Sequence, residues 1–162
     1  MKTFKLFTIA IILVSTFACK KKTETLYFNC YINGQFFSPE KQQGLGEYPL
    51  TTKLLYEGID LRIDASKGVQ NVYLGIKDST MVKILTYKLS MNKSYFSRAL
   101  YSNAMSDHYE TDSLNTGFTT ITSLDTENMI VEGTFFFNAY NSALKDTVHI
   151  TNGKFRLKYD LH

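Results

Sequence analysis

The feature that most constrains the fold is an alternation of apolar and polar side chains that continues along most of the chain. Phe28, Cys30 and Ile32 alternate with polar neighbours, and residues 59–65 and 72–76 repeat the pattern. A period of two is typical of a β-strand with one buried face, because successive side chains point to opposite sides. A 3.6-residue apolar period never lasts longer than about two turns. The sequence therefore predicts an all-β protein.

Turn residues divide the alternating stretches into about nine short strands, a spacing typical of a sandwich or a barrel. Asn33-Gly34 predicts a tight hairpin turn, and the longest irregular loop is expected between Ser38 and Leu50. The composition agrees, because 11 Tyr and 12 Phe favour strands. We expect a single antiparallel β-sandwich of eight or nine strands, with a small up-and-down β-barrel as the alternative.

Two long alternating stretches close the chain and predict a hairpin. In the first, Phe135, Phe137 and Ala139 share one face, and Val148 and Ile150 of the second stretch are expected to pair with it. Gly133, just before this face, is expected to relieve crowding or to form a β-bulge.

The last of these stretches also carries a basic stripe. The side chains of Lys154, Arg156 and Lys158 alternate with apolar ones and therefore share a side. Two interpretations are open. The stripe either binds an acidic partner or protects an edge strand against the addition of another strand.

The first 19 residues, MKTFKLFTIAIILVSTFAC, have the layout of a secretory signal. Lys2 and Lys5 form its positive region. The apolar core of residues 6–14 is far shorter than the roughly 20 residues that a membrane-spanning helix needs. Small residues then lead to Cys19. We therefore expect a cleaved signal peptide.

The segment before Cys19 resembles a bacterial lipobox, in the loosened form found in Bacteroidetes-type lipoproteins. It departs from the usual pattern because Thr16 stands where Leu is common and because Phe17 is bulky. The resemblance implies that Cys19 is lipidated and becomes the first residue of the mature chain. The alternative is an ordinary signal peptidase site near Ala18, with Cys19 incidental.

The lipoprotein interpretation divides the chain into a signal peptide (1–18), a lipidated polar tether (19–25) and a single β domain (26–162). Loss of the signal removes two lysines and no acid, so the formal charge falls from +3 to +1. Residues 20–22 are lysines, which either attract an anionic membrane or serve as a polar spacer. We expect an outer-membrane lipoprotein of the cell envelope that faces the periplasm, with surface exposure as the alternative.

Both ends of the β domain resemble a known group of proteins. FNCYINGQFF, near the start, contains an Asn-Gly-aromatic hairpin, and VEGTFFFNAYNSALKDTVHITNGKF, near the end, contains a GTFxFxA motif followed by ITNGxF. These segments resemble the small β-rich lipoproteins of Bacteroidetes that are assigned to domains of unknown function. The resemblance implies a fold and an envelope location, and it transfers no catalytic residue.

The sequence holds no strong motif for catalysis or metal binding. The three histidines, His108, His149 and His162, lack a paired ligand spacing. The acidic loop of residues 107–112 is either a calcium site or an ordinary solvated loop. Cys30 is expected as a buried core thiol. We therefore expect a protein that is not an enzyme, with no catalytic residue, no cofactor and no metal. The small net charge argues against nucleic acid as a partner.

Four tyrosines are candidates for a partner surface: Tyr95, Tyr101, Tyr109 and Tyr140. Exposed Tyr rings stack on sugars or pack on peptides, whereas Tyr rings that border a β core do neither. We expect a binding or interaction module for a protein or glycan partner, anchored to the membrane by the lipid on Cys19. The alternative is a lipocalin-like carrier that encloses a small apolar ligand.

Overall fold

The structure is a computed structural model that describes residues 25–40, 49–90, 97–104 and 107–162. In these ranges the chain is all-β, with twelve strands and one short 3-10 turn at Tyr56–Gly58. The described residues contain no helix long and apolar enough to cross a membrane. The strands are β1 (Tyr27–Ile32), β2 (Gln35–Phe37), β3 (Leu50–Leu55), β4 (Asp60–Lys67), β5 (Gln70–Lys77), β6 (Thr86–Leu89), β7 (Arg98–Ser102), β8 (His108–Glu110), β9 (Gly117–Asp125), β10 (Ile130–Asn141), β11 (Asp146–Lys158) and β12 (Asp160–Leu161).

Hydrogen bonds join all of these strands into one large, mostly antiparallel sheet. Its order is β12-β3-β4-β5-β7-β8-β10-β11-β1-β2, and β9 pairs with both β10 and β6. The expected sandwich of eight or nine strands is therefore replaced by a twelve-stranded open sheet. Two of the strands lack a clear alternating pattern in the sequence. β12 has only two residues, too few to show a period of two. The alternation in β3 is obscured because Leu54 and Leu55 are adjacent.

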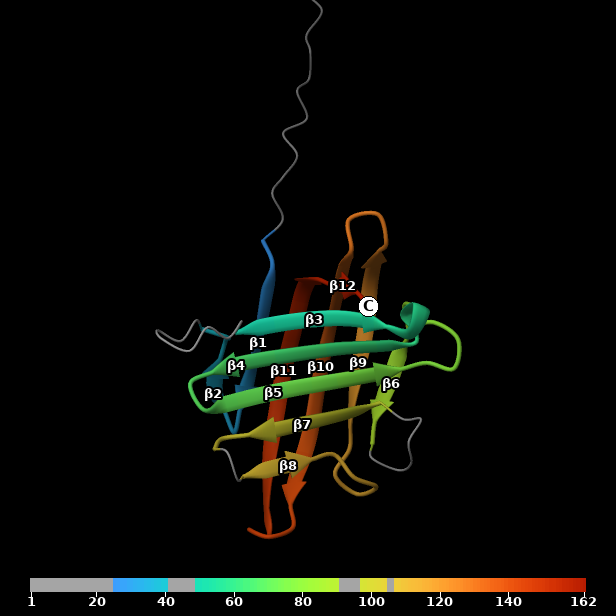
Figure 1. Cartoon of the computed structure of the whole chain (residues 1–162). Helices are drawn as coiled ribbons and strands as arrows, with labels where there is room; N and C mark the ends of the chain where they lie inside the picture. The colour runs from blue at the N-terminus through green and yellow to red at the C-terminus, as the bar shows by residue number, and fades with distance from the viewer. Residues whose placement is uncertain (1–24, 41–48, 91–96, 105–106) are drawn as a thin grey trace, which may run out of the picture.

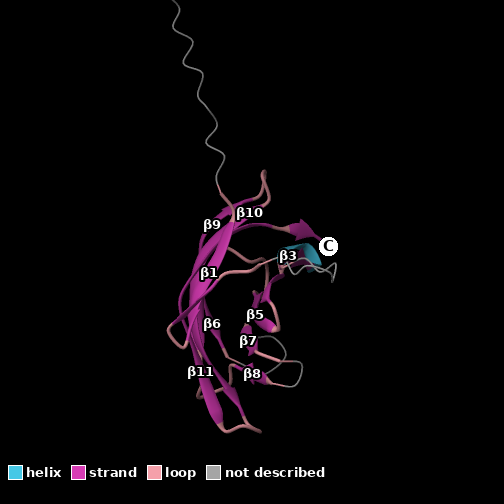
Figure 2. Ribbon diagram, turned by 90° about the vertical axis from the view of Figure 1, so that its left-hand side faces the viewer, coloured by secondary structure: helices cyan, strands magenta, loops and turns pink. Residues whose placement is uncertain are grey.

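The sheet folds over on itself, so that two layers of strands face each other (Figures 1 and 2). Strands β3, β4, β5, β7 and β8 run crosswise over β1, β11, β10 and β9 (Figure 1). The layers are joined where Glu110 of β8 pairs with Tyr140 near the end of β10. They meet again where the chain continues from β11 into β12, which pairs with β3 in parallel. The sheet is not an up-and-down barrel, because its order is not sequential: β8 is followed by β10, β9 pairs with β10 and β6, and β12 and β2 stand at the two ends of the order.

The inward side chains of both layers form one core. Phe137 pairs with Ile150 and Ala139 with Val148, which confirms the predicted hairpin, and all four side chains are buried. Cys30 is fully buried and unpaired, and burial raises the pKa of its thiol to about 12. The prediction of a buried core thiol is therefore confirmed. The largest fully buried side chains are those of Tyr159, Phe28, Phe37, Phe137 and Phe155.

Two local predictions about turns and bulges are confirmed. Asn33 and Gly34 join β1 to β2 with φ angles of 47° and 82°, a region that Asn and Gly adopt more readily than other residues. The pairing of β9 with β10 shifts between Glu132 and Gly133, as expected for a bulge. A side chain at Gly133 would clash with the carbonyl oxygen of Thr120. Most of the expected loop at 38–50 lies outside the described residues.

Candidate binding face

The alternation that fills the core also sends a second set of side chains outward from β6, β9, β10, β11, β1 and β2. We call this outer side the aromatic face; Figure 2 shows the layer that carries it on the left. The described residues expose five large aromatic side chains, and four of them lie here. Their exposed fractions are 39% for Tyr31, 61% for Phe36, 39% for Phe118 and 52% for Phe136.

The pairing register places these four rings in one row across the strands. Phe118 of β9 lies opposite Phe136 of β10, with ring centroids 5.7 Å apart. Tyr31 of β1 lies opposite Phe36 of β2, also with centroids 5.7 Å apart. On its other side Tyr31 pairs with Thr151 of β11, which stands between the two aromatic pairs. The row therefore crosses β2, β1, β11, β10 and β9.

A groove of about 430 Å³ lies in this row, and we call it the aromatic groove. Phe118 and Phe136 are its exposed rings, while the buried residues Phe135 and Gly153 lie beneath it. The remaining lining is polar and consists of Thr120, Thr134, Thr151, Asn152 and Lys154. Apolar rings beside a few polar groups are typical of a ligand site.

The groove forms where β11 bulges. The pairing of β11 with β10 shifts between Phe135 and Phe137, and its pairing with β1 shifts between Asn29 and Tyr31. Asn152 has a φ of 52° at this point, in the left-handed region that Asn tolerates better than most residues. β11 thus continues through the bulge as a strand of 13 residues.

Gly153 and the FFF run complete the geometry of the groove. A Cβ on Gly153 would lie 2.6 Å from the ring of Phe135, so the absent side chain makes room for that ring. Because Phe135 and Phe137 both point into the core, Phe136 between them must point outward.

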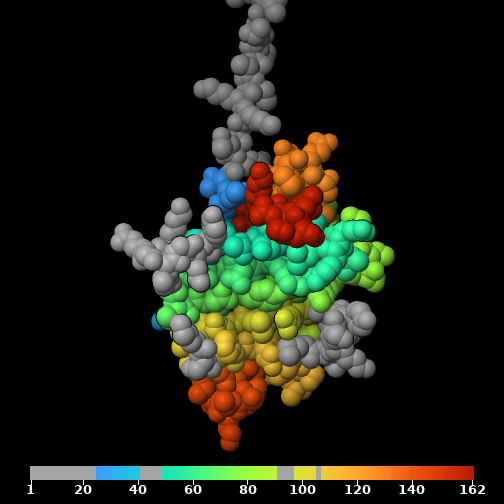
Figure 3. Space-filling model, in the orientation of Figure 1, coloured from blue at the N-terminus to red at the C-terminus, as the bar shows by residue number. Residues whose placement is uncertain are grey.

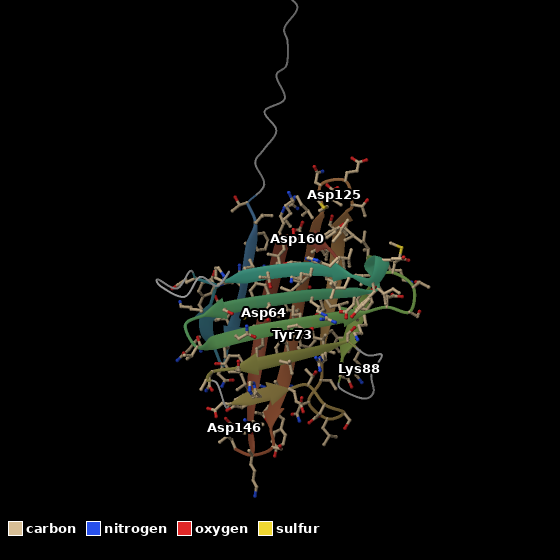
Figure 4. The ribbon with its side chains drawn as sticks, in the orientation of Figure 1. Asp64, Tyr73, Lys88, Asp125, Asp146 and Asp160 are labelled. Atoms are coloured by element: carbon tan, nitrogen blue, oxygen red, sulfur yellow. The ribbon has the colours of Figure 1, made fainter. Side chains whose placement is uncertain are left out.

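Positive charge predominates on the aromatic face. Lys88 of β6, opposite Phe118, is exposed, as are Lys154 and Lys158 of β11; Figure 4 labels Lys88 at its edge strand. Glu132 of β10 also lies on this face, and its carboxylate binds Arg156 with an Nη1–Oε2 distance of 2.7 Å. Its charge is therefore largely neutralised within the face itself.

The pairing of β11 excludes one of the two interpretations of the basic stripe. Lys154, Arg156 and Lys158 do share the outward side, as predicted. However, β11 has β10 on one side and β1 on the other, so its backbone groups are already paired. The interpretation as edge protection is wrong, because the last long strand of the chain is an interior strand of the sheet.

The tyrosines singled out from the sequence do not lie together on this face. Tyr101 and Tyr109 are only 3% and 4% exposed, and their ring centroids lie 5.8 Å apart. Burial raises the pKa of both phenols. Tyr140 is half-buried near the end of β10, and Tyr95, like Cys19, lies outside the described residues. Tyr101 and Tyr109 therefore border the core instead of facing a partner.

Sequence reasoning missed the aromatic row, although a signal for it exists. Phe118 and Phe136 stand at the alternate positions of their strands that are otherwise polar, whereas the positions between them hold apolar or small residues. An aromatic residue on the solvent side of an alternating strand is informative because nothing in the core requires it. The alternation could not predict that β9, β10, β11 and β1 are neighbours in the sheet, which is what brings the four rings into one row.

The outer side of β3, β4, β5, β7 and β8 has a different character, and we call it the polar face. It forms the front of the molecule in Figure 3. Arg62 donates a hydrogen bond of 2.9 Å to the buried carboxylate of Asp60, and the ammonium of Lys77 lies 3.8 Å from it. The guanidinium of Arg98 lies 5.8 Å from the ring centroid of Tyr73. These charged groups therefore have partners on the same strand or on a neighbouring one, although among the described residues the Oδ1 atom of Asp60 has no hydrogen-bond partner.

Asn71 and Asp64 form a further hydrogen-bonded pair on the polar face. Asn71 donates a hydrogen bond of 2.6 Å to Asp64, which stands opposite Tyr73 in the register of β4 and β5 (Figure 4). Within the described ranges, no group of three or more His, Cys, Asp or Glu side chains is placed to hold a metal ion. In the acidic loop, Asp112 accepts hydrogen bonds from the backbone amides of Leu114 and Asn115.

No curated protein and no solved structure matches the chain. One family model matches residues 24–157, a range that starts just before β1 and ends one residue before the end of β11. The match thus covers nearly all of the folded sheet, including the aromatic groove. The chain belongs to the family described as a domain of unknown function, DUF6252.

Proposed function

We propose that this protein is a non-enzymatic binding module of the bacterial cell envelope and that the aromatic groove is its ligand site. The observation that carries the proposal is the row of four exposed aromatic side chains that meets a groove at the bulge of β11. A row of this kind gains free energy when a partner covers it, because apolar ring surface leaves water.

The chemistry of the groove supports binding rather than catalysis. Its lining contains hydroxyl, amide, ammonium and aromatic groups but no carboxylate, imidazole or thiol. The side chains that most often transfer protons in enzymes are thus missing from this lining. Cys30 is a poor nucleophile because it is buried in the core and its thiol has a pKa of about 12.

The packing between the layers does not favour the alternative of a lipocalin-like carrier. Such a carrier needs a cavity in its interior. Here buried rings on the inner side of the β1, β2 and β10 layer occupy the interior, with Phe28 and Phe135 at a centroid distance of 5.1 Å and Phe28 and Phe37 at 6.4 Å. The aromatic groove lies on the outside of the sheet instead.

The envelope location rests on the leader and its resemblance to Bacteroidetes-type lipoproteins. Signal cleavage before Cys19 would leave the short stretch 19–25 between the lipid and the domain. The lipid would then hold the β domain near the membrane, with the periplasm as the expected side.

The ligand site is tested by capture of partners from envelope extracts with the full-length protein. We expect Phe118→Thr/Phe136→Thr to lose the partner that the unmodified protein retains. Tyr56→Asn is the matched control, because Tyr56 is the fifth exposed aromatic residue and lies in the 3-10 turn. Asn also suits its left-handed φ of 53°. Equal capture by the double variant and the unmodified protein would contradict the proposed site.

The anchor is tested by metabolic labelling with a fatty-acid probe. We expect Cys19→Ala to lose the label and to move from the membrane fraction to the soluble fraction. Cys30→Ala is the control for cysteine loss as such and should keep the label. A labelled Cys19→Ala protein would show that lipidation of this residue is not the anchor.

A further inference from the structure

We infer that the ligand of the aromatic groove is an acidic glycan, an extended chain of sugars that carries carboxylate groups. This inference rests on the proposed function and names the chemical class of its ligand. Three features carry it: the length of the aromatic row, the polar groups between the rings, and the charge around them.

The row is long enough for several sugar units. It runs from Phe36 on β2 to Phe118 on β9 and crosses four strand-to-strand steps. With neighbouring strands about 4.8 Å apart, these steps span roughly 19 Å. The C–H faces of sugar rings are apolar and weakly positive, so they pack on the electron-rich faces of aromatic rings. Two aromatic pairs with a groove between them therefore fit an oligomer better than a single sugar.

The groups between the rings complement sugar hydroxyls. Thr120, Thr134 and Thr151 offer hydroxyls that both donate and accept hydrogen bonds, and the side-chain amide of Asn152 does the same. An extended peptide would instead pair its backbone with the edge of a sheet. That mode is closed at the groove, because β10 and β11 are paired on both sides there.

The charge around the groove favours an anionic sugar. Lys154 lines the groove, and Lys88 stands at the end of the row beside Phe118. The groove lining holds no carboxylate, and Glu132 nearby is bound by Arg156. A carboxylate on a bound sugar would therefore meet positive potential without a repelling partner. A bilayer surface would meet the same charges, but its plane would not fill a hollow lined with hydroxyls.

The test uses the full-length protein and pairs of glycan probes that differ in charge alone. Oligogalacturonate and oligomannuronate are titrated calorimetrically beside their methyl esters, and vesicles that contain phosphatidylglycerol serve as the membrane probe. We expect at least one acid form to bind at least about tenfold more tightly than its ester, because a charged hydrogen bond is lost on esterification. We also expect the affinity to fall with added salt.

Variants separate the contributions of charge and of the rings. Lys154→Gln should lower the affinity for the acid form about tenfold, towards that of the ester. Lys53→Gln is the matched control, because Lys53 is an exposed lysine of the polar face, on β3. Phe118→Thr/Phe136→Thr should abolish binding of both forms, while thermal unfolding confirms that the variants are folded.

The outcomes distinguish the inference from the function on which it rests. Equal binding of acid and ester would overturn the acidic ligand but keep a glycan module. Binding to vesicles alone, or to none of these probes, would overturn the inference. The proposed binding function would still stand if envelope capture depended on Phe118 and Phe136, and it would fall if it did not.

Discussion

The two outer faces of this protein are made by the same sheet, yet they use their side chains in opposite ways. On the polar face, charged and polar groups bind one another, as Arg62 and Asp60 do at 2.9 Å. On the aromatic face, rings such as Phe136 stay half in water and meet mainly each other. The inward residues of both layers are mostly apolar, with buried Thr52 and Thr119 among the exceptions. The comparison teaches that the outward residues, and not the core, distinguish the self-paired surface from the proposed binding surface in this fold.

This difference has an energetic consequence. Replacing one partner of a buried charged pair leaves the other without compensation, which destabilises the folded state. Replacing an exposed ring removes little buried area and leaves no unpaired group. Changes on the polar face should therefore alter stability, and changes on the aromatic face should alter binding. Four predictions test this distinction, from the largest expected effect to the smallest.

The backbone beneath the aromatic face is expected to be the most sensitive point. Gly117 of β9 faces β10 so closely that a methyl group would clash with the carbonyl oxygen of Phe136. Gly117→Ala should lower the free energy of unfolding by about 3 kcal/mol. The melting temperature should fall on the order of 10 °C, measured by circular dichroism. Thr122→Ala, at an exposed site of the same strand, is the control. Similar melting of the two variants would refute the close contact.

The buried carboxylate of the polar face should give the next effect. Asp60 is 1% exposed, and its Oδ2 atom accepts both hydrogen bonds from Arg62. Arg62→Ala should destabilise the protein by about 2 kcal/mol, less than a fully buried pair would, because Arg62 is partly solvated and Lys77 remains near.

Urea unfolding measures this effect, and a second substitution identifies its cause. Asp60→Asn added to Arg62→Ala should recover part of the lost stability, since no buried charge is then left unpaired. Lys53→Ala, an exposed neighbour opposite Arg62 in the register of β3 and β4, is the control. A double variant that is less stable than Arg62→Ala would argue against a charge effect.

The exposed rings should show a smaller effect on stability. Phe118→Thr and Phe136→Thr each remove one member of an exposed pair and insert a residue that strands accept. Each should change the free energy of unfolding by less than about 1 kcal/mol. The measurement is the same urea titration, and it should contrast with the loss of partner capture. A large loss of stability would mean that these rings support the fold.

The connection between the layers should make a small, pH-dependent contribution to the free energy of unfolding. Asp78, between β5 and β6, accepts hydrogen bonds from the Thr80 amide and the Tyr87 hydroxyl. The Thr80 amide is the main cause that holds the pKa of Asp78 below its usual value, although burial acts in the opposite direction. A carboxyl group with a lowered folded-state pKa stabilises the fold above its unfolded pKa, and this stabilisation is lost as the pH falls through the folded value.

Asp78→Asn should therefore be less stable than the unmodified protein at pH 7, and the difference should shrink below about pH 4. Chemical unfolding at a series of pH values measures it, with Glu127→Gln in the exposed β9–β10 turn as the control. A stability difference that stays constant from pH 7 to pH 3 would show that Asp78 does not act through its charge.

Local features of the sequence predicted much of the fold because they depend on neighbours in the chain. The alternation around Phe135 predicted the closing hairpin, and Asn33-Gly34 predicted its own turn. Gly133 predicted a bulge, and the position of Cys30 in its strand predicted burial. Each of these properties follows from a period of two or from the φ preference of one residue. The all-β class, most of the strands and their inward faces were therefore determined by the sequence itself.

Only the tertiary structure decided which strands are neighbours and which surface remains open. β1 pairs with β11, from the opposite end of the domain, and this pairing turns a basic stripe that could protect an edge into an interior one. The same assembly buries Tyr101 under a second layer and leaves Phe118 beside Phe136 in water. The reason is physical: a strand pattern specifies which side chains share a face, whereas the partner that covers that face depends on contacts between distant segments.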